Sequence, residues 1–262
     1  MFSCVERGWR RLAAIVSYTS FCLGGVICSL LVFPLMFIVV REQRTRSLLA
    51  RKFIHLLFRL FLNFIQKLGV ISFEVDGMEK LQRNGLLILG NHPSLLDVVL
   101  LISLISRADC VVKAKLLRNP IMRGALLTAG YICNDSGPLL VDECISSLRA
   151  GNNLIIFPEG TRTRPGLPVS LQRGAAHVAV RGGVAITPVL IHCNPPYLTK
   201  QQAWWSVPPQ RPHFRIEIRD DWAMPMPLAS TASEAVAARR LTETLSQYFA
   251  KETQGDCRYG CA

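Results

Sequence analysis

A histidine and an aspartate stand five positions apart in an otherwise aliphatic stretch, LILGNHPSLLDVVLL; they are His92 and Asp97. A carboxylate that accepts a hydrogen bond from one imidazole nitrogen fixes the tautomer and raises the basicity of the other nitrogen, which gives a general base near neutral pH. The same spacing also suits a structural arrangement, in which His92 caps a helix and Asp97 pairs with a nearby base. The pair alone leaves both interpretations open.

A second group of chemically capable residues follows in NLIIFPEGTRT. An apolar run ends at Pro158, and Glu159, Gly160, Thr161 and Arg162 follow on a predicted turn. Glycine allows a ligand to approach the backbone closely, and the guanidinium presents a fork that suits a phosphate or a carboxylate. A turn that only ends a strand seldom combines these residue types, so the stretch predicts an anion-binding turn.

The elements that must position these residues follow a pattern of short apolar runs alternating with helical periodicity, which predicts an α/β fold. The predicted strands lie near residues 71–76, 86–90, 110–113, 153–157, 185–192 and 214–219. The predicted helices lie near residues 93–106, 120–127, 142–150 and 171–181. The proline-rich stretch 194–212 predicts a surface loop, and a capping box from Thr231 to Glu234 predicts a last helix.

The first pair is predicted to lie where a strand meets a helix. The strand ends at Gly90, and Pro93 is expected to open the helix because the first helical turn does not need its missing N–H. His92 would then lie at the C-terminal end of the strand, where open α/β sheets place their ligands. Asp97 would lie a little over one turn into the helix and reach back to the imidazole.

The N-terminal region combines a long apolar segment with basic flanks. Ala13 to Val40 is 28 residues without a charge, and about 20 residues span a bilayer core. The net charge is +12, and residues 1–60 hold nine Lys or Arg against two Glu. Basic residues beside an apolar segment favour anionic lipid head groups, and no zinc-finger or aromatic RNA-binding motif supports nucleic acid as a partner. We therefore expect a membrane segment, which either spans the bilayer or anchors the chain as a re-entrant or in-plane helix.

Residues 51–70 place Phe and Leu at helical spacing with Lys and Arg between them. This pattern is typical of a basic amphipathic helix at the membrane surface, and an ordinary helix facing a protein core fits nearly as well. The nine cysteines contain no CxxC pair, which indicates reduced thiols in a cytosolic compartment. The heavier basic flank after Val40 favours a cytoplasmic placement of the rest of the chain.

The two motifs together resemble the signature motifs of the glycerolipid acyltransferase family, typified by bacterial 1-acylglycerol-3-phosphate acyltransferases. Their order and separation agree with the family. The resemblance runs from about Ile71 to His192 and includes two weaker blocks, GYICND at 130–135 and ITPV at 186–189. It implies an α/β fold with a mixed sheet flanked by helices, an N-terminal membrane helix and a second amphipathic helix.

The resemblance also implies a reaction and a set of roles. The family moves a fatty acyl chain from acyl-CoA or acyl-carrier protein (acyl-ACP) to a lipid hydroxyl, with no metal and no other cofactor. His92 would take the hydroxyl proton while Asp97 orients the ring, and Lys113 is the candidate for stabilising the oxyanion. Direct transfer fits, because the sequence has no GxSxG nucleophile elbow. The residues implied to hold the acceptor are Glu159, Gly160, Thr161 and Arg162.

One position departs from the family pattern. The family's second block has an arginine after the aspartate, and here Ser136 follows Asp135. Losing one guanidinium weakens a phosphate site, since charge-assisted hydrogen bonds are the strong ones. Either Arg118, Arg123 or Arg164 replaces it, or the acceptor is another lipid, such as a lyso-ornithine lipid, a lysophospholipid or a specialised bacterial lipid.

These features predict two regions, a membrane anchor of residues 1–70 (apolar helix 13–40, amphipathic helix 51–70) and an acyltransferase domain of residues 71–262. The expected location is a bacterial inner membrane, with the catalytic domain in the cytoplasm and membrane lipids as partners. The alternative from another class is a non-catalytic lipid-binding membrane protein. The histidine–aspartate pair counts against that alternative, because a binding module does not need one.

Overall fold

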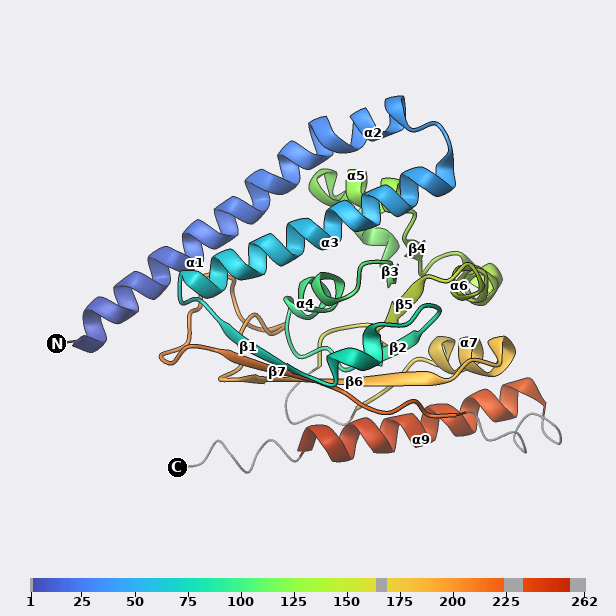
Figure 1. The fold of residues 1–262 in the computed structure, drawn as a ribbon. Coiled ribbons are helices and arrows are strands. Elements are labelled where there is room, and N and C mark those ends of the chain that lie inside the picture. The colour runs from blue at the N-terminus through green and yellow to red at the C-terminus, as the bar shows by residue number, and fades with distance from the viewer. Residues whose placement is uncertain (1, 164–168, 224–232, 255–262) are drawn as a thin grey trace.

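A seven-stranded mixed sheet with helices on both faces forms the centre of the protein (Figure 1). The structure is a computed structural model that describes residues 2–163, 169–223 and 233–254. The strands are β1 (Ser72–Asp76), β2 (Leu87–Gly90), β3 (Ala108–Val112), β4 (Ile132–Cys133), β5 (Asn153–Ile156), β6 (Ile186–Asn194) and β7 (His213–Ile218). Their order is β1-β7-β6-β2-β5-β3-β4, and β6 and β7 pair antiparallel while the other neighbours are parallel. The expected mixed α/β fold is confirmed.

The two central strands β2 and β5 are direct parallel neighbours. Leu87 pairs with Leu154 and Leu89 with Ile156, so both strands end at the same edge of the sheet. All their residues are buried, as expected for the centre of a parallel sheet covered on both faces. The sheet topology therefore brings together the two motifs, which follow β2 and β5 and lie more than sixty positions apart in the sequence.

Helices cover each face of the sheet, and the strands alternate their side chains between the two sides. Ile88 and Ile155 belong to one hydrophobic cluster, whereas Leu87, Leu89 and Leu154 belong to the other. The first face packs against α3 (Gln43–Lys67) and α4 (Asp97–Leu104), with α5 (Pro120–Ala129) beside them; the second packs against α6 (Leu140–Arg149), α7 (Gly174–Gly182) and α9 (Glu234–Gln254). Short 3₁₀ turns lie at Met78–Leu81, Ala114–Arg118 and Gly137–Leu139.

The N-terminal region is a pair of long helices. One continuous helix runs through α1 (Phe2–Ile27), a π-helical turn (Cys28–Val32) and α2 (Phe33–Val39), and α3 runs back alongside it (Figure 1). Within it, Gly8–Val39 is long and apolar enough to cross a membrane by length and composition. Both helices begin about ten residues earlier than expected, since no proline interrupts these first turns.

The helix α3 has an apolar face on each side. Ile54, Leu62 and Ile65 are buried against the domain, whereas Leu56 and Leu60 are more than half exposed. The sequence pattern allowed a membrane-surface helix or a core-facing helix, and one side of α3 faces a protein core. Its other side presents exposed leucines.

A buried ion pair joins α3 to the sheet. Arg51 Nη2 lies 2.8 Å from Asp109 Oδ2, and the two side chains are only 6% and 2% exposed. The guanidinium also donates to the carbonyl of Ala129 at 2.9 Å, and Asp109 accepts a hydrogen bond from the Ser147 hydroxyl. A charge removed from water in this way needs such partners, so α3 belongs to the packed body of the protein.

Some elements differ from the sequence prediction. The helix expected from Pro93 begins at Asp97, because the Ser94 N–H donates to Asp97 Oδ2 and the Leu96 N–H donates to the Ser94 hydroxyl, which forms a turn in place of a first helical turn. The two-residue strand β4 was not predicted, since it is too short for a hydrophobic pattern. The last helix is present from Glu234, and Thr231 lies outside the described residues.

Candidate active site

The histidine and the aspartate of the first motif form a direct hydrogen bond. His92 Nδ1 lies 2.8 Å from Asp97 Oδ2, and the same oxygen accepts the Ser94 N–H at 2.7 Å. Because Oδ2 already accepts from a backbone amide, it is an acceptor toward the imidazole as well, and Nδ1 carries the proton. The other ring nitrogen, Nε2, is then the basic one.

The surroundings of this pair hold the imidazole in one orientation. The Asp97 side chain is fully buried, and burial raises the pKa of its carboxyl while the hydrogen bond from His92 opposes that shift. The His92 ring stacks on Phe157 with centroids 4.4 Å apart and keeps 14% of its side chain exposed. The ring is therefore packed on one side and accessible on another.

The second motif clamps the backbone of His92. The Thr163 N–H donates to the His92 carbonyl at 2.7 Å, and the His92 N–H donates to Thr163 Oγ1 at 3.2 Å and to Glu159 Oε1 at 3.3 Å. The Thr163 hydroxyl in turn donates to Glu159 Oε1 at 2.5 Å. Gly160 lies between them with φ of +65°, a conformation that favours glycine and turns the chain back toward His92. Thr163 did not stand out in the sequence, since threonines are common in turns.

Glu159 lies behind the histidine. Its carboxylate is occupied by the Thr163 hydroxyl and the His92 amide, and burial raises its pKa. It does not line the cavity beside His92, whereas Gly160, Thr161 and Arg162 do. We therefore expect Glu159 to position the backbone of His92, and the acceptor role implied by the family resemblance stays a prediction.

Replacing Glu159 separates positioning from acceptor binding. Glu159→Ala is expected to lower kcat about 10- to 100-fold with the acceptor KM within about twofold, because small displacements of a catalytic group are costly and the acceptor contacts remain. Glu159→Gln keeps a carbonyl oxygen that accepts both hydrogen bonds and should regain most of the rate. Steady-state kinetics of the two variants test this expectation. A raised acceptor KM with normal kcat would return Glu159 to the acceptor site.

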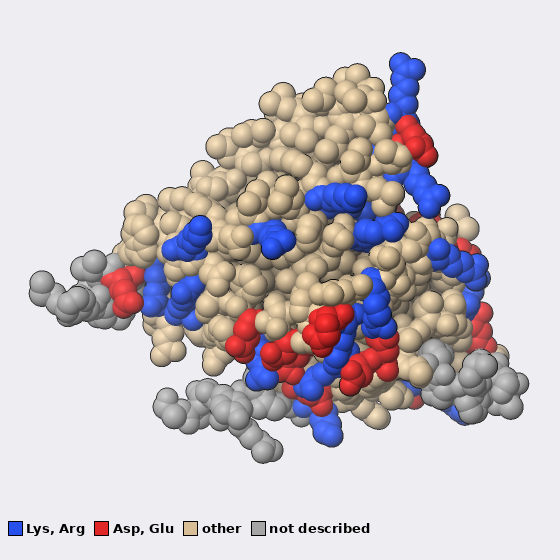
Figure 2. All heavy atoms as spheres, viewed as in Figure 1, with Lys and Arg blue, Asp and Glu red and all other residues tan. Residues whose placement is uncertain are grey.

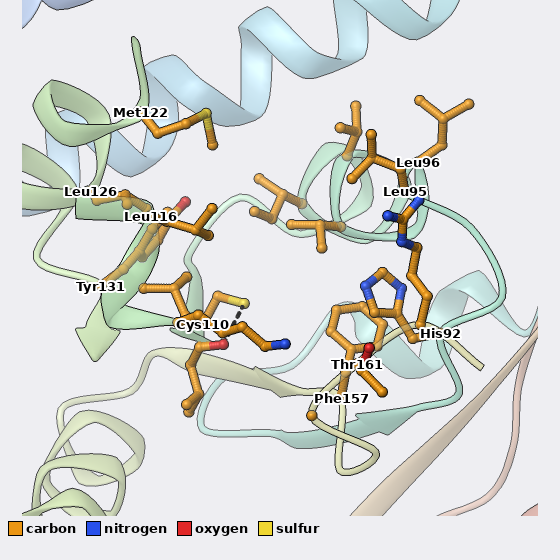
Figure 3. A pocket seen from close by; sticks show the side chains of 18 of the residues that line it. His92, Leu95, Leu96, Cys110, Leu116, Met122, Leu126, Tyr131, Phe157 and Thr161 are labelled. Atoms are coloured by element: carbon orange, nitrogen blue, oxygen red, sulfur yellow. Dashed lines mark hydrogen bonds between the residues drawn. The ribbon is translucent and has the colours of Figure 1, made fainter. Parts of the chain in front are cut away.

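A cavity of about 1240 Å³ opens beside His92. Figure 3 shows His92, Phe157 and Thr161 on one side of an open space, with Leu116, Met122, Leu126 and Tyr131 across from them. Residues of α1, α3, α4 and α5 line it, together with the loop after β6. Its volume exceeds the 300–1,000 Å³ that is usual for small-molecule sites, and its walls are mostly apolar. A long aliphatic chain suits such a space.

The helix α1 forms one wall of this cavity and joins the loop after β6. Tyr18 stacks on Trp204 with ring centroids 4.2 Å apart, and Arg10 donates to the carbonyl of Pro209 at 2.6 Å. On α1, the side that carries Ala14, Tyr18 and other cavity residues lies opposite a row of exposed apolar side chains. The N-terminal helix therefore contributes directly to the site.

The charged residues that line the cavity are all cationic among the described residues: Lys113, Arg162, Arg173 and Lys200. Arg162 Nη1 donates to the carbonyls of Leu198 and Thr199 at 2.7 and 2.9 Å, which ties the turn after β5 to the loop after β6. An anionic head group fits this setting. Sequence reasoning missed Arg173 and Lys200, because an isolated basic residue in a loop resembles any surface residue.

Ser136 stands where the family has an arginine, and its hydroxyl makes polar contacts with other parts of the protein. Ser136 Oγ lies 3.0 Å from Glu143 Oε2 and 3.0 Å from the carbonyl of Cys133. Of the three arginines suggested as replacements, Arg118 and Arg123 line a separate cavity of about 450 Å³, and Arg164 lies outside the described residues. Neither Arg118 nor Arg123 lines the cavity beside His92.

The fold and the site define a class of α/β protein in which a His–Asp pair lies at the edge of an apolar cavity that the long N-terminal helices help to line. The acyltransferase family model matches residues 72–192, the region that holds both motifs. The family resemblance predicted from the motifs is confirmed.

Several relatives are 1-acyl-sn-glycerol-3-phosphate acyltransferases. The Pseudomonas aeruginosa protein is 32% identical over 128 residues, 45% of this chain and 49% of that protein. The Borreliella burgdorferi protein is 29% identical over 132 residues, 48% and 53% of the two chains. The chloroplast protein LPAT1 of Arabidopsis thaliana is 28% identical over 153 residues, 54% and 41% of the two chains. The chain thus spans about half the length of these curated relatives.

A solved structure shares the fold. The crystal structure of the 1-acyl-sn-glycerophosphate acyltransferase PlsC from Thermotoga maritima aligns with a TM-score of 0.66 and 19% identity, over 94% of this chain and 98% of that one. The alignment covers the N-terminal helices as well as the sheet, since it extends over nearly the whole of both chains. At this identity the likeness supports the fold.

Proposed function

We propose that this protein transfers a fatty acyl chain from acyl-CoA or acyl-ACP to the hydroxyl of a lysolipid of the 1-acylglycerol-3-phosphate type. The observation that carries the proposal is the 2.8 Å hydrogen bond between His92 Nδ1 and Asp97 Oδ2 at the mouth of a large apolar cavity. A base, a chain-sized cavity and cationic walls are what such a transfer requires. The relatives are named as 1-acyl-sn-glycerol-3-phosphate acyltransferases, which supports an acceptor of this type.

The reaction needs a base, an oriented acceptor and a stabilised oxyanion. His92 Nε2 takes the proton of the acceptor hydroxyl as its oxygen bonds to the thioester carbon, and the carbonyl oxygen becomes an oxyanion. When this intermediate collapses, the carbon–sulfur bond breaks and the sulfur takes the proton from Nε2, so that an ester and a free thiol are released. Lys113, which lines the cavity at the end of β3, is our candidate for the oxyanion contact.

The cationic residues of the cavity are assigned to the phosphate of the acceptor. Gly160 and Thr161 would present the turn after β5, and Arg162 would hold the phosphate with its guanidinium. Arg173 and Lys200 would add charge at the same mouth. They supply the positive charge that the family places after the aspartate of its second block.

Replacing Arg162 tests this assignment. Arg162→Ala is expected to raise the acceptor KM about 10- to 100-fold, the usual effect of losing a hydrogen bond between charged groups, with a smaller change in the donor KM. Arg162→Lys should restore only part of the loss, since an ammonium lacks the planar fork. Arg118→Ala, at the separate cavity, is the matched control. An acceptor KM that stays the same in Arg162→Ala would remove Arg162 from the acceptor site.

A second acceptor class is favoured by the contact of Ser136. Its hydroxyl lies 3.0 Å from Glu143 Oε2, which places a negative charge where the family has a positive one. A lysolipid without the terminal phosphate monoester of lysophosphatidate, such as a lyso-ornithine lipid, another lysophospholipid or a specialised bacterial lipid, would use the same base and the same cavity. The chemistry is unchanged, and only the head group differs.

One experiment tests the function and chooses the acceptor. Membranes that contain the protein are incubated with labelled acyl-CoA or acyl-ACP and a panel of lysolipids, and the labelled product is identified by mass spectrometry. A labelled phosphatidate supports the first proposal, and another labelled lipid supports the second. Binding of the lipids without any transfer would instead support the non-catalytic lipid-binding alternative.

We also propose that residues 1–70 anchor the catalytic residues 71–262 to the cytoplasmic face of a bacterial inner membrane. Figure 2 shows few charged side chains over α1 and α2, with Lys and Arg gathered over α3. Leu30, Leu31, Ile38 and Val39 are each more than 60% exposed, which is costly in water and favourable in lipid.

The membrane proposal predicts how the protein is extracted. High salt should leave it in the membrane fraction, because apolar burial does not depend on screened charges, and a detergent should release it. Immunoblots of the soluble and pelleted fractions measure this. Release of the intact chain by salt alone would contradict a lipid-embedded helix.

A further inference from the structure

A tyrosine lies deep in the cavity, across from His92. Tyr131 follows α5 directly before β4, and the Arg51 guanidinium carbon lies 5.9 Å from the centroid of its ring. Figure 3 shows its side chain reaching toward the space next to Leu116, Met122 and Leu126. The ring thus stands between the buried ion pair and the apolar end of the cavity.

The hydroxyl of this tyrosine is buried and has no hydrogen-bond partner among the described residues. Buried hydroxyl groups are nearly always hydrogen-bonded, because their transfer out of water is otherwise unfavourable. Burial also raises the pKa of the Tyr131 phenol, so the group is a neutral donor at every physiological pH.

The neighbouring side chains do not provide a partner. Leu116, Met122 and Leu126 are apolar, and the nearby Cys110 thiol is turned to the carbonyl of Val111 at 3.6 Å. Leu116, Met122 and Leu126, which lie next to the tyrosine in Figure 3, offer no oxygen or nitrogen acceptor, and a buried water would need two to four polar partners of its own. We therefore expect the hydrogen-bond partner of the Tyr131 hydroxyl to be an atom of the ligand that fills the cavity.

We propose that the Tyr131 hydroxyl hydrogen-bonds to an oxygen atom carried on a lipid chain in the cavity, so that the protein selects a hydroxylated or otherwise oxygen-substituted acyl chain. This inference rests on the proposed function, in which an acyl chain enters the cavity beside His92. The oxygen belongs either to the donor chain or to the chain already on the acceptor. A plain chain leaves the hydroxyl unpaired, which is how such a site rejects it.

Matched lipids test the proposal and separate its two sources. In one arm, acyl-CoA donors of equal length, plain or hydroxylated at successive carbons, are offered with a plain lysolipid. In the other arm, plain acyl-CoA is offered with lysolipids whose own chain is plain or hydroxylated. We expect the wild-type protein to prefer a hydroxylated lipid in one arm by about three- to tenfold in kcat/KM, the usual effect of one neutral hydrogen bond.

The variant Tyr131→Phe removes only the hydroxyl and is expected to bring that preference to about one. Tyr248→Phe, on α9 and against Trp222 on the other face of the sheet, is the matched control and should keep the preference. A wild-type protein without preference in either arm, or a preference that survives in Tyr131→Phe, would overturn the inference.

Failure of the proposed function is distinguishable from failure of this inference. If no lipid is acylated by any donor, the proposed function fails. The inference is then tested by the binding of plain and hydroxylated fatty acids to the detergent-solubilised protein and to Tyr131→Phe. Tighter binding of a hydroxylated fatty acid that is lost in Tyr131→Phe supports it, and equal binding overturns it.

Discussion

Replacing His92 with alanine is expected to lower the rate of acyl transfer by about 10²- to 10⁴-fold, the usual contribution of a general base. In the proposed mechanism the imidazole takes the acceptor proton, whereas Glu159 and Thr163 contact the backbone of His92. Binding of donor and acceptor should change little, because the cationic and apolar walls of the cavity remain. Single-turnover rates with a labelled acyl donor measure the effect.

Two further variants make this result specific. Asp97→Asn keeps the shape of the side chain and removes its charge, so the tautomer of His92 is no longer fixed and the rate should also fall by at least about 10²-fold. His177→Ala, on α7 with Glu234 as its partner at 3.3 Å, is the control and should keep the rate. Near-normal turnover in His92→Ala would end the proposed mechanism.

Replacing Arg51 with alanine is expected to lower the free energy of unfolding by about 3–5 kcal/mol, the usual cost of stranding one partner of a buried ion pair. Asp109 would remain buried without its guanidinium, and the carbonyls of Ala129 and Gly130 would lose the hydrogen bonds that Arg51 donates. The measurement is equilibrium unfolding of the detergent-solubilised protein in urea.

Two control variants accompany Arg51→Ala. One replaces another arginine of α3, and the other replaces both residues of the ion pair. Arg59→Ala, exposed on α3, should change the free energy of unfolding by no more than about 0.5 kcal/mol. The double variant Arg51→Met, Asp109→Leu should be more stable than Arg51→Ala, because no unpaired charge remains in it. Equal stability of Arg51→Ala and Arg59→Ala would show that the ion pair does not hold α3 in place.

The sequence predicts the fold and the main motifs because those depend on local patterns. The apolar runs of β2 and β5 are continuous, and His92, Asp97 and Arg162 stand at their ends, so the strand assignment already places them at one sheet edge. The same reasoning missed Thr163, whose role depends on a contact with the backbone of His92 across 71 positions.

Other features depend on contacts of individual side chains, which a local sequence pattern does not predict. Arg51 and Asp109 are 58 positions apart, and each resembles an ordinary surface residue in the sequence. Pro93 suggested a helix start, yet the carboxylate of Asp97 and the hydroxyl of Ser94 bind nearby amides and delay the helix by four residues. Side-chain competition for backbone groups decides that boundary, and helix propensity does not describe it.

The helix α1 has two sides with different neighbours. Ala14, Ser17, Tyr18 and Phe21 line the cavity, whereas exposed residues such as Leu23 face outward. With α1 in a bilayer as proposed, only the width of one helix, about 10–12 Å, would separate the lipid phase from the reaction chamber. A lysolipid would then reach His92 by a lateral step around α1, without ever dissolving in water, and its supply would follow the composition of the membrane.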